Sequence, residues 1–273
     1  MAGRLEGTYL ERIIAHHRAR AAADSRSLEE LGESAARVSA PARGFSAAIS
    51  AAEGTAVIAE VKRRSPSRGD LAVDLEPAAT ARAYEKGGAS CLSVLTEREH
   101  FGGSRSDLEA ARAAVGLPVL RKDFTVSQAD IYDARVMGAD AVLLIAAALG
   151  DEELATFLET ARRLGLDALV EVHDGRELDR ALSLGAGLIG VNQRDLHTFA
   201  VDPDRAVRLR AEMPKGVVSV AESGLTRPEQ VAVLAEAGFD AVLVGEGFVT
   251  APDPAAAVEG FVAAGRSAAA RCG

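Results

Sequence analysis

The chain has few cysteines and no long apolar run, and each absence excludes a class of protein. Its two cysteines, Cys91 and Cys272, lack metal-binding or redox spacing. We expect Cys91 to be a buried small hydrophobe. The longest apolar run, from Ala141 to Leu149, is about half of what a membrane span needs. Because the first residues show no secretory signal, we expect a reduced, cytoplasmic protein with no membrane partner.

The chain also lacks an excess of positive charge. Its formal net charge of −9 argues against a nucleic-acid partner, although a local basic pocket can still bind phosphate. With 273 residues, of which 48% are hydrophobic, the chain can bury a large core. One α/β barrel commonly reaches this length.

The first part of the chain, residues 8–50, is predicted to be helical. Capping-box patterns at Thr8–Glu11 and Ser27–Glu30 each introduce apolar residues at helical spacing. We expect residues 1–50 to be a helical N-terminal extension of a single domain that spans residues 1–273.

From residue 57 onward one unit recurs, consisting of a helix-ending glycine, a short polar turn and an apolar strand. Clear copies begin at Gly88, Gly138, Gly165, Gly185 and Gly238. With looser copies and an opening strand, the pattern predicts eight strands, near residues 57–62, 90–96, 118–123, 141–146, 167–173, 188–193, 217–222 and 241–246.

Helix-start signals lie between these strands, at the spacing of βα units with short loops. Eight consecutive units with mostly apolar strands favour an α/β fold of the (β/α)₈ TIM barrel type. An open doubly wound sheet is the alternative, but it usually has fewer strands and a glycine-rich first turn, which this chain lacks.

The first predicted strand carries two opposite charges. Glu60 and Lys62 are two residues apart, so their side chains share one face of the strand. Charged groups are rarely buried unless they are paired or needed for chemistry. The turn that follows, Ser65–Gly69, offers hydroxyls and backbone N–H groups to an anion. An internal ion pair beside a surface loop is the alternative interpretation of this segment.

The active site of such a barrel lies at the carboxyl ends of its strands. The polar residues at the predicted strand ends are Glu60, Lys62, Lys122, Glu171, Asn192, Arg194, Glu222 and Ser223. Alternate strands supply the same interior layer, so we expect three carboxylates and two lysines to meet there. Such a cluster shifts pKa values and supplies an acid and a base. A charge network that only seals the barrel mouth is the alternative.

A phosphate site is predicted in the loops after strands 7 and 8, where barrels of this kind often bind phosphate. These loops contain Ser223–Gly224 and Gly245–Gly247, and glycines let backbone N–H groups approach an anion. The loop Ser65–Ser67 lies across the ring. The Glu246 N–H can bind phosphate only if the Glu246 carboxylate points away.

Seven motifs occur in order along the chain: Ala59–Ser67, Leu95–Thr96 with Phe101–Ser104, Leu120–Phe124, Leu169–His173, Ile189–Leu196, Ala221–Gly224 and Val244–Gly247. In this order, and over nearly the whole chain, they resemble the indole-3-glycerol phosphate synthase family. Two residues depart from the family's pattern. Arg68 stands where lysine is frequent and Glu246 where serine is common, and both bear on phosphate affinity.

The resemblance implies closure of the indole pyrrole ring from 1-(o-carboxyphenylamino)-1-deoxyribulose 5-phosphate, with loss of carbon dioxide and water and without a metal or organic cofactor. It assigns Lys122 as the acid of ring closure and Glu171 as the base of dehydration. Glu60 and Lys62 would share the second step, and Asn192 would position a substrate hydroxyl or the acid. We expect Lys62 to lower the pKa of Lys122.

The resemblance also implies the residues that bind substrate. Arg194 would hold the anthranilate carboxylate, and Glu222 with Ser223 would complete the floor. Phe124 and Leu196 would face the aryl ring. The implied phosphate ligands are Ser65, Gly224, Gly245 and the backbone of Glu246. The expected partner is therefore a phosphorylated small molecule, and the sequence identifies no partner enzyme.

Two other functions are the alternatives. A phosphate-binding barrel isomerase such as phosphoribosylanthranilate isomerase would carry a cysteine at the end of strand 1, where this chain has Glu-Val-Lys. A catalytically silent partner subunit would be expected to lack Lys122 or Glu171, and both are present. Other polar residues of the motifs are interpreted as structural or rim groups: Arg63, Arg121, Asp123 and His173.

Overall fold

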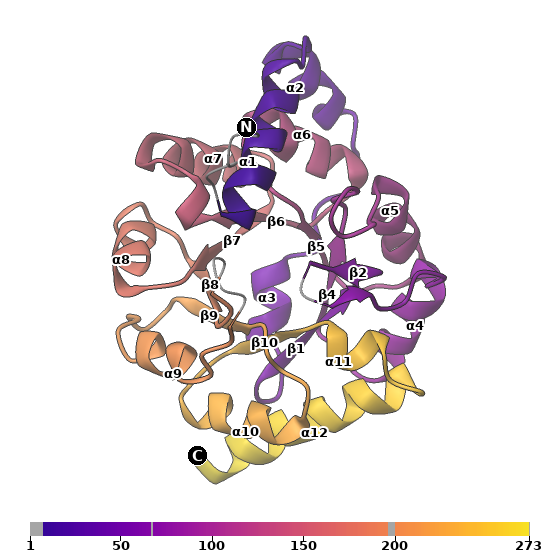
Figure 1. Cartoon of the computed structure of the whole chain (residues 1–273), viewed down its shortest axis with the longest axis vertical. Coiled ribbons are helices and arrows are strands. Elements are labelled where there is room, and N and C mark those ends of the chain that lie inside the picture. The colour runs from indigo at the N-terminus through magenta and orange to yellow at the C-terminus, as the bar shows by residue number, and fades with distance from the viewer. Residues whose placement is uncertain (1–7, 67, 196–199, 273) are drawn as a thin grey trace, which may run out of the picture.

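A closed barrel of eight parallel strands forms the centre of the computed structural model, which describes residues 8–66, 68–195 and 200–272 (Figure 1). Strand β1 pairs with both β4 and β10, so the sheet has no free edge. The strands are β1 (Ala56–Val61), β4 (Cys91–Leu95), β5 (Val119–Lys122), β6 (Ala141–Ile145), β7 (Asp167–Val172), β8 (Leu188–Asn192), β9 (Val218–Glu222) and β10 (Ala241–Val244). All eight predicted strands are confirmed.

Helices follow the strands and surround the barrel in Figure 1. They are α4 (Pro77–Lys86), α5 (Arg105–Ala114), α6 (Gln128–Met137), α7 (Asp151–Arg163), α8 (Gly175–Ser183), α9 (Asp204–Arg210), α10 (Pro228–Glu236) and α12 (Pro254–Cys272). Smaller elements lie in the loops: the hairpin of β2 (Arg64–Ser65) and β3 (Gly69–Asp70), the 3₁₀-helix η1 (Ala146–Ala148) and α11 (Glu246–Val249). The predicted (β/α)₈ TIM barrel is confirmed.

Alternation along the strands divides the core into two layers. On β1, Val57 and Ala59 pack in the layer between the strands and the helices, whereas Ala56 and Ile58 belong to the barrel interior. Cys91 of β4 lies in that interior, fully buried with a free thiol, as predicted. Each large apolar side chain buried in this way contributes roughly 1.5–3 kcal/mol to folding.

The N-terminal extension forms three helices, α1 (Tyr9–Ala22), α2 (Leu28–Ala36) and α3 (Phe45–Ser50). Both predicted capping boxes are present, at Thr8 and at Ser27. Helix α2 packs against α6. No helix in the described ranges has the length and apolar character needed to cross a bilayer.

Helix α3 lies within the ring of strands in Figure 1 and closes one end of the barrel. Its Phe45 and Ile49 are buried in the same interior layer as Ile58 and Leu243. At the start of the helix, Asp167 of β7 accepts hydrogen bonds from the Ser46 backbone and hydroxyl, both at 3.0 Å. With the N-terminal end of the barrel filled in this way, the opposite end remains for a site.

Candidate active site

The charged side chains of the site extend the inward-facing rows of the strands. On β1, Glu60 follows the interior residue Ile58 by two positions, which places both side chains on the same face. The same spacing places three further charged residues at the carboxyl ends of β5, β7 and β9: Lys122, Glu171 and Glu222. The predicted convergence follows from this alternation.

Lys122 lies between two carboxylates. Its Nζ is 3.6 Å from Glu222 Oε2 and 3.7 Å from Glu171 Oε2. Asn192 of β8 donates its Nδ2–H to the other oxygen of Glu171, Oε1, at 3.1 Å. Glu171, Asn192 and Glu222 are all buried, so these contacts act in a medium that screens charge poorly.

Glu60 and Lys62 form a second ion pair, with 2.6 Å between Glu60 Oε1 and Lys62 Nζ. Ser93 of β4 donates its hydroxyl to Glu60 Oε2 at 3.4 Å. The pair reaches the backbone of Gly245, where a Cβ would collide with the Glu60 carboxylate and stand 2.8 Å from Lys62 Nζ. A larger residue at position 245 would displace the ends of both side chains.

The charge cluster sets the protonation of its members. Burial lowers the pKa of Lys122, but Glu222, Glu171 and Glu60 raise it more, so its net pKa lies above the usual range. The expectation that Lys62 lowers the pKa of Lys122 is therefore wrong, because the nearby carboxylates dominate. At neutral pH Lys122 holds its proton.

The pKa values of two carboxylates in the cluster, Glu222 and Glu60, shift in opposite directions. The pKa of Glu222 is raised to about 8. Burial and the repulsion of Glu171 and Glu60 raise it, and the attraction of Lys122 opposes them. Burial also raises the pKa of Glu60, but Lys62 and Lys122 hold it below its usual value. At neutral pH Glu222 is therefore largely a carboxylic acid and Glu60 a carboxylate.

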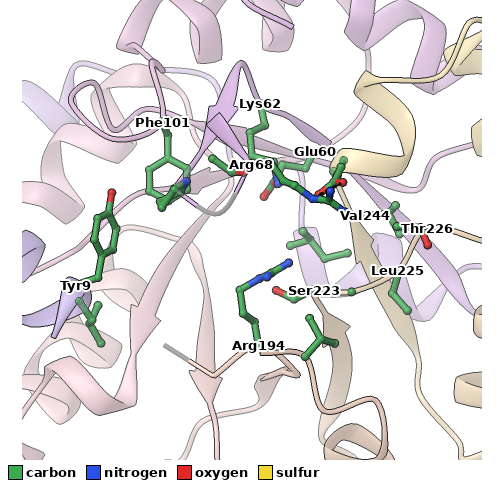
Figure 2. A pocket seen from close by; sticks show the side chains of 18 of the residues that line it. Tyr9, Glu60, Lys62, Arg68, Phe101, Arg194, Ser223, Leu225, Thr226 and Val244 are labelled. Carbon is green, nitrogen blue, oxygen red and sulfur yellow. Dashed lines mark ion pairs between the residues drawn. The ribbon is translucent and has the colours of Figure 1, made fainter. Parts of the chain in front are cut away.

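A pocket of about 630 Å³ lies at this end of the barrel (Figure 2). Figure 2 shows Tyr9 and Phe101 on one side, Lys62 and Arg68 on another, and Arg194 extending towards the centre. The predicted site residues that line the pocket are Glu60, Lys62, Ser65, Phe124, Arg194, Ser223, Gly224, Gly245 and Glu246. The pocket is not lined by four of the predicted residues: Lys122, Glu171, Asn192 and Glu222. Their cluster is coupled to the pocket electrostatically, because the charge of Glu60, which lines the pocket, raises the pKa of Lys122. Leu196 and Ser67 lie outside the described residues.

The predicted phosphate end of the pocket has an unusual backbone. Ser223 has a φ of 68° and is the one non-glycine residue with positive φ in the described ranges. Gly224 follows with a φ of 76°, and a Cβ there would meet Val201 Cγ1 at 2.5 Å. A strained serine beside a pocket is typical of a functional loop. Across the pocket the Ser65 hydroxyl is buried and has no partner in the described part of the chain.

The contribution of the N-terminal extension to this pocket was not predicted from the sequence. Tyr9, Leu10 and Ile13 of α1 line it. Next to them, Phe124 packs against Phe101, with ring centroids 6.2 Å apart, and also against His17 of α1, at 5.3 Å. The helical spacing of the apolar residues in α1 indicated a packing face, but it did not identify the surface that this face covers.

No group of three or more His, Cys, Asp or Glu side chains in the described part of the chain is arranged to hold a metal ion. Two of the residues interpreted as structural form a buried ion pair, with 3.0 Å between Arg121 Nη2 and Asp123 Oδ2. Arg63 pairs with Asp107 at 3.1 Å. His173 lies beside Glu171, with 3.5 Å between Nε2 and Oε1.

Solved structures share the barrel. The thiamine phosphate pyrophosphorylase from Pyrococcus furiosus matches with a TM-score of 0.60 and 14% identity, covering 79% of this chain and 97% of that chain. A structure titled "Native KDPGal structure" matches with a TM-score of 0.56 and 19% identity, covering 78% and 95%. At these identities the likeness shows the fold alone.

The sequence comparisons are more specific. A family model described as indole-3-glycerol phosphate synthase matches residues 10–261. The indole-3-glycerol phosphate synthase of Mycolicibacterium vanbaalenii is 52% identical over 260 residues, covering 94% of this chain and 95% of the relative. That of Streptomyces griseus is 51% identical over 247 residues, covering 90% and 91%. The chain therefore belongs to the indole-3-glycerol phosphate synthase family.

Proposed function

We propose that this chain is a carboxy-lyase that converts 1-(o-carboxyphenylamino)-1-deoxyribulose 5-phosphate to indole-3-glycerol phosphate in tryptophan biosynthesis. The observation that carries the proposal is the position of Lys122, within 3.7 Å of both Glu171 and Glu222 at the carboxyl end of the barrel. Beside this cluster lies a pocket with polar loops at one end and aromatic side chains at the other.

The two ends of the pocket fix the orientation of the substrate. The phosphate lies at the loops of Ser223 and Gly245, where it accepts hydrogen bonds from the Ser65 hydroxyl and from the N–H groups of Gly224, Gly245 and Glu246. The aryl ring packs on Phe101 and Phe124, and Leu196 is proposed to join them. Arg194, which extends into the pocket (Figure 2), binds the anthranilate carboxylate. Ser223 and Glu222 form the floor.

Ring closure needs an acid at the substrate carbonyl. The aryl carbon that bears the carboxylate attacks the carbonyl carbon, and Lys122 gives its proton to the carbonyl oxygen. Carbon dioxide then leaves, and the electron pair of the broken bond restores the aromatic ring. The carboxyl of Glu222, 3.6 Å from Lys122 Nζ and largely protonated at neutral pH, is positioned to return a proton to Lys122.

Dehydration needs a base and an acid on the same intermediate. Glu171 removes the proton from the carbon next to the nitrogen, and the hydroxyl departs as water after taking a proton from Lys62. The Glu60–Lys62 pair, which lines the pocket, shares this second step. Asn192 positions the base by donating a hydrogen bond to Glu171 Oε1.

We further propose that the enzyme works in the cytoplasm on this phosphorylated small molecule. The free, buried thiol of Cys91 fits a reducing compartment.

Product fluorescence tests the function directly. The chain contains no tryptophan, so indole formation appears over a low protein background when the carboxyphenylamino substrate is added. Lys122→Ala abolishes the signal, whereas Lys215→Ala, at an exposed lysine, preserves it. Glu171→Gln slows turnover by at least about 100-fold, while the affinity for inorganic phosphate stays within a few fold.

Three outcomes contradict the proposal: no product from the wild type, full activity of Lys122→Ala, or collapse of phosphate affinity in Glu171→Gln. Turnover of phosphoribosylanthranilate in place of the carboxyphenylamino substrate would favour the isomerase alternative.

A further inference from the structure

His173 is fixed between two carboxylates at the end of β7. Its ring Nδ1 is 3.1 Å from Glu177 Oε2, and its backbone N–H donates to the same oxygen at 2.8 Å. Its Nε2 is 3.5 Å from Glu171 Oε1. Glu177 is itself held at the start of α8, where its backbone N–H donates to Asp174 Oδ1 at 2.8 Å. The orientation of the ring is therefore set from both sides.

The contact with Glu177 determines where the ring carries its first proton. An ionised carboxylate only accepts hydrogen bonds, so Nδ1 must be the donor towards Glu177. A neutral ring then has its lone pair on Nε2, facing an oxygen of Glu171 across 3.5 Å. Nε2 is buried and has no hydrogen-bond partner in the described part of the chain. A second proton on Nε2 converts this repulsive contact into an attractive one.

The charges around the ring favour that second proton. Burial lowers the pKa of His173, but the hydrogen bond to Glu177 and the charges of Glu171 and Glu177 outweigh burial and raise it above the usual 6.5. Arg205 of α9 opposes them. Arg205 is itself occupied, since it donates to the Asn192 carbonyl at 3.1 Å and lies 3.9 Å from Asp195.

We propose that His173 is a positioning residue for the base Glu171. With Asn192, its protonated ring holds Oε1 of Glu171, which leaves Oε2 directed towards Lys122, 3.7 Å away. The positive ring also attracts the negative charge of the Glu171 carboxylate across 3.5 Å. This inference rests on the proposed function, and it gives a role to a residue that the sequence placed among rim or structural groups.

Two substitutions separate charge from shape. His173→Gln places an uncharged amide N–H near the position of Nε2, whereas His173→Leu removes both donor and charge. We expect His173→Leu to lower kcat by up to about 100-fold, because a misplaced base loses its reactive geometry, with KM within a few fold. Compared with His173→Leu, His173→Gln should recover most of the wild-type kcat when both are measured at a single pH. Its pH profile should, however, lack the transition that the wild type shows above pH 6.5. His16→Gln, at an exposed histidine of α1, is the control and behaves like the wild type.

A second measurement does not depend on catalysis. The chain has five histidines, and the His173 ring is assigned in NMR spectra by its loss in His173→Gln. We expect this ring to titrate above pH 6.5 in the wild type and at lower pH in Glu177→Gln. Titration below 6.5, or unchanged kcat and pH profile in both His173 variants, would overturn the inference. If Glu171→Gln keeps full activity, the proposed function fails instead.

Discussion

Arg68 Nε lies 3.2 Å from Glu246 Oε1, so the two residues that depart from the family's pattern form an ion pair with each other. Arg68 lies in the β2–β3 hairpin and Glu246 begins α11, and both line the pocket near the proposed phosphate site. From the sequence, the Glu246 carboxylate was expected to oppose phosphate binding unless it pointed away from the site. Its carboxylate is instead paired with a cation that can bind phosphate itself.

Glu246→Ser is expected to strengthen the binding of inorganic phosphate. The ion pair is partly exposed and therefore worth no more than about 1 kcal/mol, so a phosphate dianion can displace Glu246 from Arg68. Removing the carboxylate should tighten phosphate binding about fivefold, measured by calorimetry or as competitive inhibition. In an Arg68→Ala background the gain should shrink, and Glu229→Gln, at an exposed carboxylate, should change nothing. Weaker phosphate binding by Glu246→Ser would contradict this account.

Gly190→Ala is expected to damage catalysis without unfolding the barrel. A Cβ at position 190 would collide with Glu222 Oε1 and stand 3.2 Å from Leu169 Cδ1. Moving Glu222 disturbs its contact with Lys122, so kcat should fall by about 10- to 100-fold, with about 1–3 kcal/mol of lost stability. Gly187→Ala is the matched control just before the same strand, since a Cβ there meets nothing within 4 Å. Equal kcat values for the two variants would show that Glu222 has room to move.

Glu222→Gln is expected to flatten the pH dependence of stability. The pKa of Glu222 is about 8 in the folded protein against an ordinary 4.5, so the folded state binds this proton more tightly than the unfolded state. The free energy of unfolding should therefore fall as pH rises from about 4.5 to 8, by on the order of 4 kcal/mol from this group. Urea unfolding of the wild type and Glu222→Gln across this range measures the difference. Glu152→Gln, at an exposed carboxylate, should retain the wild-type slope.

His17→Phe is expected to make the protein more tolerant of acid. Burial lowers the pKa of His17 below 6.5, an effect to which Arg20 adds and which Asp123, Glu97 and Asp130 oppose. Because the unfolded state then binds the proton more tightly, the wild type should lose stability as pH falls below about 6.5. Phenylalanine removes this titration and keeps an aromatic ring against Phe124. Chemical unfolding at pH 5.0 and 7.5 tests this, and equal losses in both proteins would contradict it.

The fold and the convergence of the charged strand ends were readable from the sequence, because both follow from alternation along strands. Two positions after Ile58 comes Glu60, and the same spacing places Lys122 and Glu171 at the ends of β5 and β7, which lie on either side of β6. Once eight βα units are recognised, barrel geometry brings these residues to one end. No distance between the side chains is needed for that step.

The energetics of the site were not readable, because they depend on distances. The sequence predicted that Lys62 would lower the pKa of Lys122, but carboxylates, two of them at 3.6 and 3.7 Å, outweigh the effect of burial and raise it. The left-handed backbone of Ser223 was also hidden, since serine rarely adopts positive φ. The partner surface of Tyr9 could not be identified, because an apolar helix face does not specify what it covers.

Helix α3 has a consequence for biosynthesis. The ribosome makes the chain from its N-terminus, so Phe45 and Ile49 emerge long before Ala241 and Leu243, with which they share the barrel interior. The ring itself closes only when β10 reaches β1. Helix α3 is thus translated before the last strands that cover it, and its apolar face stays incompletely covered until β9 and β10 have been made.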